Sequence, residues 1–156
     1  MGYQFAGVFV GLEPYSDDAA LNLMGAAREH WPDARVRGID YPFRGIGIAL
    51  PNVDSYARYE QALEVRGTME SVLSALSTKY PEATFVFVEA DCFGGICEYA
   101  GYVCRAGTLR ERTDEADTRA QSDSLARLVS HLGVTLAPDQ DFEPLVRGYF
   151  DRAERK

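Results

Sequence analysis

Residues 83–105 read ATFVFVEADCFGGICEYAGYVCR, and the interpretation of the whole chain depends on this stretch. Ala83 to Asp91 is rich in β-branched and aromatic residues, which is typical of a strand. Gly94-Gly95 suits a two-residue type I′ or II′ turn, because glycine accepts a positive φ. Residues 96–105 then return as a second strand. The stretch therefore predicts a β-hairpin with a defined register.

That register aligns residues of the same kind across the hairpin. Cys92 faces Cys97, and Asp91 faces Glu98, with Glu89 one pleat away on the same face. Two carboxylates about 5 Å apart repel each other by roughly 1–3 kcal/mol between the dielectrics of water and a protein surface. Four things can offset that repulsion: water, arginines of the same chain, a basic partner or a divalent metal ion.

Hydrophobic periodicity places the remaining elements. It predicts strands at residues 3–12, 35–41 and 43–50 and helices at residues 17–31, 54–80, 113–132 and 142–150. The sequence therefore predicts an α+β fold: an antiparallel sheet with the ferredoxin-like βαββαβ order, plus an extra hairpin strand and two C-terminal helices. We expect residues 1–156 to form a single domain, with an α+β core at 1–106 and a C-terminal helical segment at 107–156 packed on it.

Charge narrows the classes of partner. The 156 residues include 16 lysines and arginines and 24 aspartates and glutamates, a net charge of −8. An acidic chain repels phosphate backbones and anionic membranes, so we expect no nucleic acid and no membrane among its partners. A cationic protein is the favoured partner. The N-terminal stretch has no basic region and only a short apolar run, which predicts a cytoplasmic location.

The cysteines and histidines form no recognisable catalytic constellation. Cys92 and Cys97 alternate onto an apolar face of the hairpin, so we expect both to face the core as reduced thiols, although a cross-strand disulfide is geometrically possible on oxidation. His30 and His131 each fall at the end of a predicted helix, where the helix dipole favours them. We therefore assign no catalytic residue and expect no cofactor.

The segment FVEADCFGG at residues 87–95, followed by a glycine-containing strand, resembles a pattern found in small uncharacterised bacterial proteins. In these proteins an acidic strand precedes an aromatic residue and Gly-Gly, and the chain closes with a leucine-rich helix ending in Leu-Gly-Val. Here Leu125 to Val134 is that closing element, so the pattern covers about the last half of the chain. Such proteins resemble the immunity proteins of bacterial toxin systems. Cys92 and Cys97, which flank the turn here, depart from the pattern.

Two functional hypotheses follow. The leading one is a small acidic binding protein, an immunity protein that neutralises a cognate bacterial toxin, with Glu89, Asp91, Phe93 and Glu98 as its partner-binding residues. A secreted toxin is one candidate for this partner. The alternative is a metal-dependent enzyme in which Glu89, Asp91 and Glu98 hold Mg²⁺ or Ca²⁺, because these ions prefer oxygen ligands. A third class, an RNA-binding sheet with an aromatic surface of Tyr3, Phe5, Phe85 and Phe87, is disfavoured by the negative charge.

Overall fold

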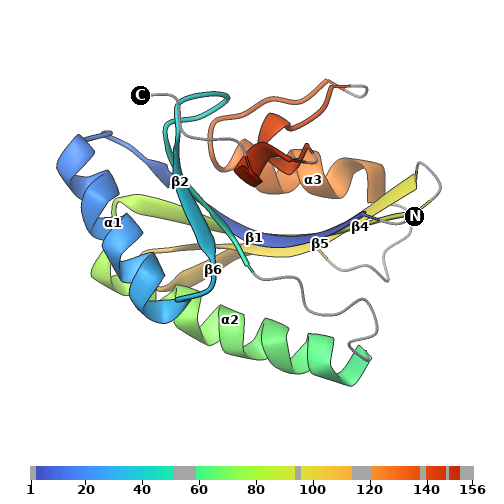
Figure 1. The fold of residues 1–156 in the computed structure, drawn as a ribbon, viewed down its shortest axis with the longest axis horizontal. Coiled ribbons are helices and arrows are strands. Elements are labelled where there is room, and N and C mark those ends of the chain that lie inside the picture. Colours follow the sequence, from blue (N-terminus) through green and yellow to red (C-terminus); the bar gives the residue numbers. More distant parts are fainter. Residues whose placement is uncertain are drawn as a thin grey trace.

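The computed structural model is an α+β structure built on one six-stranded antiparallel sheet (Figure 1). It describes residues 3–50, 59–93, 96–113, 121–137, 140–146 and 148–151. The strands are β1 (Tyr3–Leu12), β2 (Arg35–Ile39), β3 (Gly45–Ala49), β4 (Ala83–Phe93), β5 (Ile96–Arg105) and β6 (Thr108–Thr113), in the spatial order β2-β3-β1-β4-β5-β6. The helices are α1 (Asp17–His30), α2 (Tyr59–Lys79) and α3 (Gln121–Ser130), followed by the 3₁₀ turns η1 (Glu143–Leu145) and η2 (Tyr149–Asp151).

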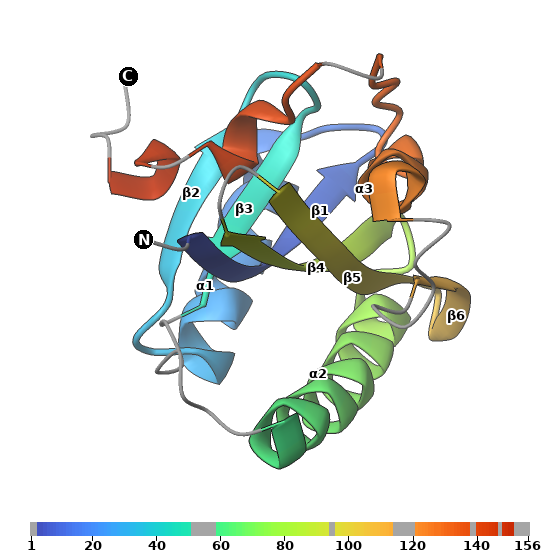
Figure 2. The same cartoon turned by 90° about the vertical axis from the view of Figure 1, so that its right-hand side faces the viewer.

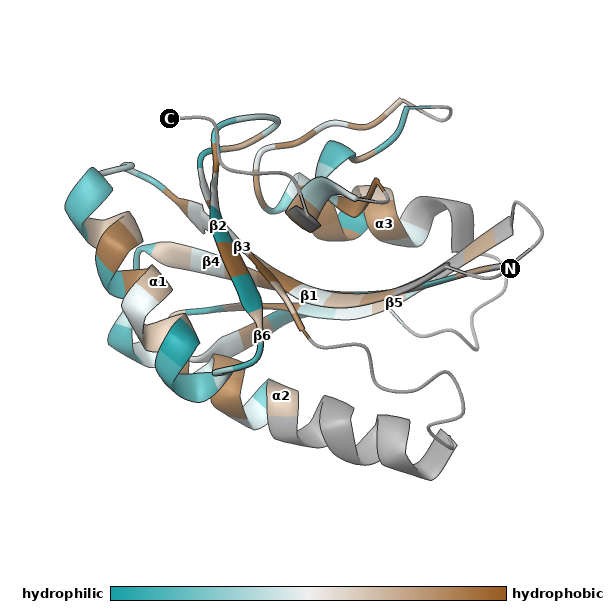
Figure 3. Ribbon diagram, viewed as in Figure 1, coloured by the Kyte–Doolittle hydropathy of each residue, from teal (hydrophilic) through white to brown (hydrophobic). Residues whose placement is uncertain are grey.

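Helices lie on both faces of the sheet (Figures 1 and 2). α1 and α2 cover one face, while α3 and the C-terminal segment cover the other. Because side chains alternate along a strand, β1 sends Val8 to the first face and Phe9 to the second, and both are fully buried. Figure 3 shows hydrophobic residues along the central strands between the helices, while the edge strands β2 and β6 and both ends of α1 carry hydrophilic residues.

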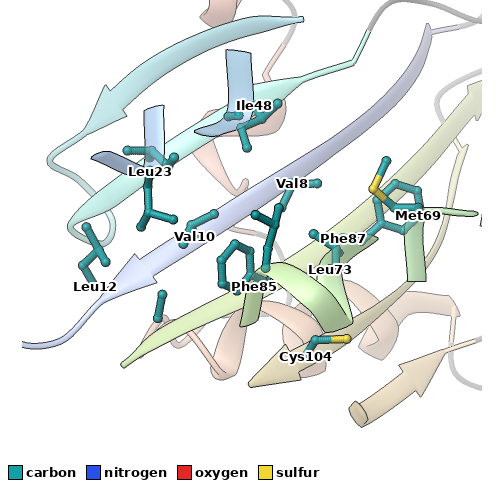
Figure 4. Close-up of a cluster of buried hydrophobic side chains, with 14 of the residues drawn as sticks. Val8, Val10, Leu12, Leu23, Ile48, Met69, Leu73, Phe85, Phe87 and Cys104 are labelled. Carbon is teal, nitrogen blue, oxygen red and sulfur yellow. The ribbon is translucent and has the colours of Figure 1, made fainter. Parts of the chain in front are cut away.

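The core between the sheet and the first two helices follows the predicted apolar stripes. Figure 4 shows Leu73 of α2 lying against Phe85 and Phe87 of β4. On α1, the Ser16 side chain accepts a hydrogen bond from the backbone N–H of Ala19 at 3.1 Å, which caps the helix as its sequence predicts. The starts of two predicted helices, residues 54–58 and 114–120, lie outside the described residues.

The aromatic surface considered for RNA binding does not form. Phe5 lies on the α3 face, stacked on Phe9 with ring centroids 5.9 Å apart. Phe85 and Phe87 lie on the opposite face, buried under α1 and α2. The reason is the register between β1 and β4, which places Phe5 opposite Ala90.

The predicted ferredoxin-like layout with an extra hairpin strand and two C-terminal helices is wrong in two respects. The sheet contains a sixth strand, β6, where a helical segment was expected. Ala106 and Gly107 connect β5 to β6 with φ values of 51° and 77°, the left-handed conformation of a tight hairpin turn. Of the two predicted C-terminal helices, the described residues contain only α3. The described residues of the second one contain the 3₁₀ turns η1 and η2 instead, since Val146 is extended and Gly148 has a φ of 86°.

Hydrogen bonds connect β6 and the turn before it to α2 on one face of the sheet and to the α3 region on the other. Ser77 Oγ accepts a hydrogen bond from the Gly107 N–H at 2.9 Å, which holds the β5–β6 turn on α2. From the other side of the strand, the carboxylate of Glu111 accepts a hydrogen bond from Arg127 at 2.8 Å and lies 2.7 Å from Nε2 of His131. Partial burial alone would raise the pKa of Glu111, but the hydrogen bonds from His131 and Arg127 lower it.

Candidate binding site at the β4–β5 hairpin

The strand register of the hairpin confirms the pairing predicted from Gly94-Gly95. Asp91 pairs with Glu98, and Cys92 pairs with Cys97. Asp91 and Glu98 are therefore brought opposite each other at the end of the hairpin.

The acidic face of the hairpin is the one that α1 and α2 cover further along the sheet. Glu89 and Asp91 alternate with buried residues of the other face, and Phe85 and Phe87 continue their row into the core. Asp91 is exposed and Glu89 is half-buried. Within the described residues, Asp91 has no ion pair, so no arginine there neutralises its charge. The side chains of Phe93 and Glu98, two of the four predicted binding residues, lie outside the described part.

The opposite face of the hairpin carries a disulfide. Cys92 and Cys97 are bonded, with their Cα atoms 4.0 Å apart, and both are half-buried. The prediction that both are core-facing thiols is therefore wrong. Directly opposite residues of an antiparallel pair have closely spaced Cα atoms, which brings the two sulfur atoms within bonding distance. Cys104 is free and buried, and its burial raises the pKa of its thiol.

A pocket of about 260 Å³ opens beside this disulfide. It lies where the end of the hairpin meets α3 and the C-terminal segment, and ten residues line it: Ala90, Cys92, Cys97, Tyr99, Leu125, Gln140, Asp141, Phe142, Leu145 and Val146. The hairpin contributes the first four, α3 contributes one, and the C-terminal segment contributes the rest. The pocket and the acidic face thus belong to opposite faces of the same hairpin.

One carboxylate lies at the pocket. Asp141 is exposed, and no cation of the described residues pairs with it. Burial raises the pKa of the Tyr99 phenol, and the negative charge of Asp141 raises it further. The phenol of Tyr99 therefore stays protonated at neutral pH. Next to Asp141, the side-chain oxygen of Gln140 accepts a hydrogen bond from the backbone N–H of Ala137 at 3.2 Å.

Sequence reasoning missed this pocket for a physical reason. Its two halves lie about forty residues apart in sequence, and periodicity predicts a helix for the C-terminal half, where the structure has the 3₁₀ turn η1. One local signal was available. Tyr99 follows Cys97 by two residues, so alternation places its side chain on the same face as the disulfide.

Two further findings concern metal binding and membrane crossing. In the part of the chain that the structure describes, no group of three or more His, Cys, Asp or Glu side chains is arranged to hold a metal ion. The Glu98 side chain is not in that part, so the metal site of Glu89, Asp91 and Glu98 stays a prediction. No helix among the described residues is both long and apolar enough to cross a bilayer.

Comparison of the chain with protein-family models, with curated proteins and with solved structures gives no significant match.

Proposed function

We propose that this chain is a small acidic binding protein that acts in the cytoplasm as the immunity partner of a bacterial toxin, and that the β4–β5 hairpin binds the toxin's cationic surface. The observation that carries the proposal is the alignment of Asp91 opposite Glu98, with Glu89 on the same face. A strand pair gains no stability from like charges held opposite each other. A cationic partner turns that repulsion into attraction and increases the rate and specificity of association.

The test is a double variant, Asp91→Asn with Glu98→Gln. The matched control, Asp33→Asn with Glu82→Gln, makes the same change in net charge at two exposed positions outside the hairpin. Removing close charge pairs costs roughly 1.5–7 kcal/mol in measured interfaces, so the hairpin variant should lose binding by at least about tenfold. Its melting temperature should stay the same or rise, because the repulsion is gone.

The assay is survival of cells that express the polypeptide encoded directly upstream of this gene, together with wild-type or variant protein. We expect the wild type and the control to protect and the hairpin variant to fail. Equal protection by both variants, or a destabilised hairpin variant that still protects, would assign the carboxylates a structural role. The metal-dependent alternative predicts something different: calorimetry should then detect tight Mg²⁺ or Ca²⁺ binding that Asp91→Asn abolishes.

A further inference from the structure

The pocket beside the Cys92–Cys97 disulfide combines apolar walls with one carboxylate that has no cation among the described residues. Leu125, Leu145 and Val146 are among the apolar residues that line it, and Asp141 supplies the charge. Its volume of about 260 Å³ lies just below the roughly 300–1,000 Å³ of pockets that hold drug-sized ligands. A single amino-acid side chain is the class of ligand that fits this size.

The chemistry of the pocket selects among side chains. An acidic side chain is repelled by Asp141 and by the net charge of −8. A purely apolar one would fill the apolar part of the pocket but leave the charge of Asp141 without a partner, and any desolvation of that charge is unfavourable. A cation with an aliphatic stem satisfies both parts, because the stem packs on the apolar surface while the charge meets the carboxylate.

Tyr99 favours arginine over lysine. Its ring is half-buried in the pocket, and the guanidinium is planar, stacks on aromatic rings and binds carboxylates through two parallel hydrogen bonds. The charge of Asp141 reaches Tyr99, since it contributes to the raised pKa of that phenol. An aromatic ring and a carboxylate are thus close together at one small pocket.

We infer that this pocket binds an arginine side chain of the partner protein, with the guanidinium against Asp141 and Tyr99 and the stem against Leu145 and Val146. The inference rests on the proposed function for the identity of the partner, and it extends the binding surface to the second face of the hairpin. A partner that encloses the end of the hairpin then contacts acidic side chains on one face and fills the pocket on the other.

The test uses two small probes and needs no toxin. One is N-acetylarginine methylamide. The other is N-acetylcitrulline methylamide, which has the same shape with a neutral urea in place of the guanidinium. Both are titrated into ¹⁵N-labelled protein and followed by NMR. We expect saturable shifts at Tyr99 and Leu145 with the arginine probe, and binding about fivefold weaker with the citrulline probe, the factor expected of an exposed ion pair.

Variants of Asp141 test whether its carboxylate supplies the charge that binds the arginine probe. Asp141→Asn should weaken binding of the arginine probe about fivefold, whereas Asp141→Glu should largely restore it. Asp40→Asn is the matched control, because Asp40 is an exposed carboxylate that follows β2 at the far edge of the sheet. The amide spectrum of each variant reports at the same time whether it is folded.

Three results would overturn the inference: no saturable shift at the pocket, equal affinity for both probes, or unchanged affinity in Asp141→Asn. The proposed function is tested separately by the Asp91→Asn, Glu98→Gln variant. If that variant loses protection but binds the probe normally, the pocket and the acidic face act independently. If the probe fails to bind while the wild type protects, the inference fails and the proposed function stands.

Discussion

Removing the Cys92–Cys97 disulfide should destabilise the protein by a predictable amount. The perturbation is the double variant Cys92→Ser with Cys97→Ser. Both residues are half-buried, so serine hydroxyls at these positions can stay in contact with water. The crosslink joins residues only five apart in sequence and closes a short loop. In the chain-entropy model, a loop of this length contributes about 2 kcal/mol at 25 °C, close to the lower end of measured disulfides.

That free energy corresponds to a measurable shift in melting temperature. For a chain of this size, 1 kcal/mol moves the midpoint by about 2–4 °C, so the double variant should melt about 4–8 °C below the wild type. The native register should survive, because β4 and β5 remain paired from Thr84 through Asp91. The loss therefore arises mainly in the unfolded state, which gains conformational freedom.

The assay is a thermal melt followed by circular dichroism, with and without a thiol reductant. Alkylation and mass spectrometry establish in each sample whether the bond is present. Reductant should lower the midpoint of the wild type toward that of the variant and should leave the variant unchanged, because Cys104 is a buried free thiol. If the bonded wild type and the variant melted within about 1 °C of each other, the chain-entropy reasoning would be refuted.

Two further predictions concern how β6 is held. Gly107→Ala should destabilise the protein by about 1–3 kcal/mol in chemical denaturation, because the residue has a φ of 77° and a Cβ there would clash with Oγ1 of Thr78. The control is Gly25→Ala, at an open position of α1, which should stabilise the protein by up to about 1 kcal/mol in the same assay. Glu111→Gln should cost about 1–2 kcal/mol near pH 7. Because the folded-state pKa of Glu111 is lowered, that stabilisation is fully present above the unfolded-state pKa and is lost as pH falls through the lower folded-state pKa. The difference in melting temperature between wild type and Glu111→Gln should therefore shrink steadily as the pH is lowered from 7 into the acidic range. A difference that stays constant down to the pH of acid unfolding would contradict this prediction.

The sequence predicted the hairpin register well because the signal is local. Two glycines at a turn and strict alternation around them determine which residues face each other, and the structure pairs Asp91 with Glu98 accordingly. The same holds for α1, whose cap at Ser16 and apolar spacing lie within one short segment. Features encoded by neighbouring residues can be recognised without knowledge of the rest of the fold.

The sequence does not predict β6 because the turn before it and its own hydrophobic pattern are both weak signals. In the turn, Ala106 has a left-handed conformation that residues other than glycine rarely adopt, so the sequence predicts no turn between β5 and β6. The strand itself is an edge strand, and of its residues only Thr113 is buried. An edge strand with polar residues on both faces shows no hydrophobic alternation, and charged side chains there protect the edge from pairing with other chains.

The C-terminal segment shows a different limit. Its apolar residues recur at helical spacing, and most of them are buried, while two contact side chains of a distant strand. Phe142 packs edge-on against Phe9 with ring centroids 5.2 Å apart, and Phe150 stacks on Phe5 at 5.8 Å. Periodicity predicts that these residues are buried but does not specify the backbone conformation, and Gly148 ends any helical path with a positive φ. The half of the pocket that this segment forms is therefore also beyond the reach of local patterns, whereas alternation from Cys97 does place Tyr99 in the other half.

The disulfide and the proposed cytoplasmic action constrain each other. Disulfides are rare in the cytosol, where those that form are mostly transient, catalytic or redox-sensing. Cys92 and Cys97 are half-buried and line the pocket, so we expect the bond to be open to exchange with a thiol from solution. In cells quenched rapidly with acid, a protein acting in the cytoplasm should therefore carry both as free thiols, with the lower stability worked out above. A pair found bonded in such cells would place the folded protein in an oxidising compartment, and the acidic hairpin would then have to meet its cationic partner outside the cytoplasm.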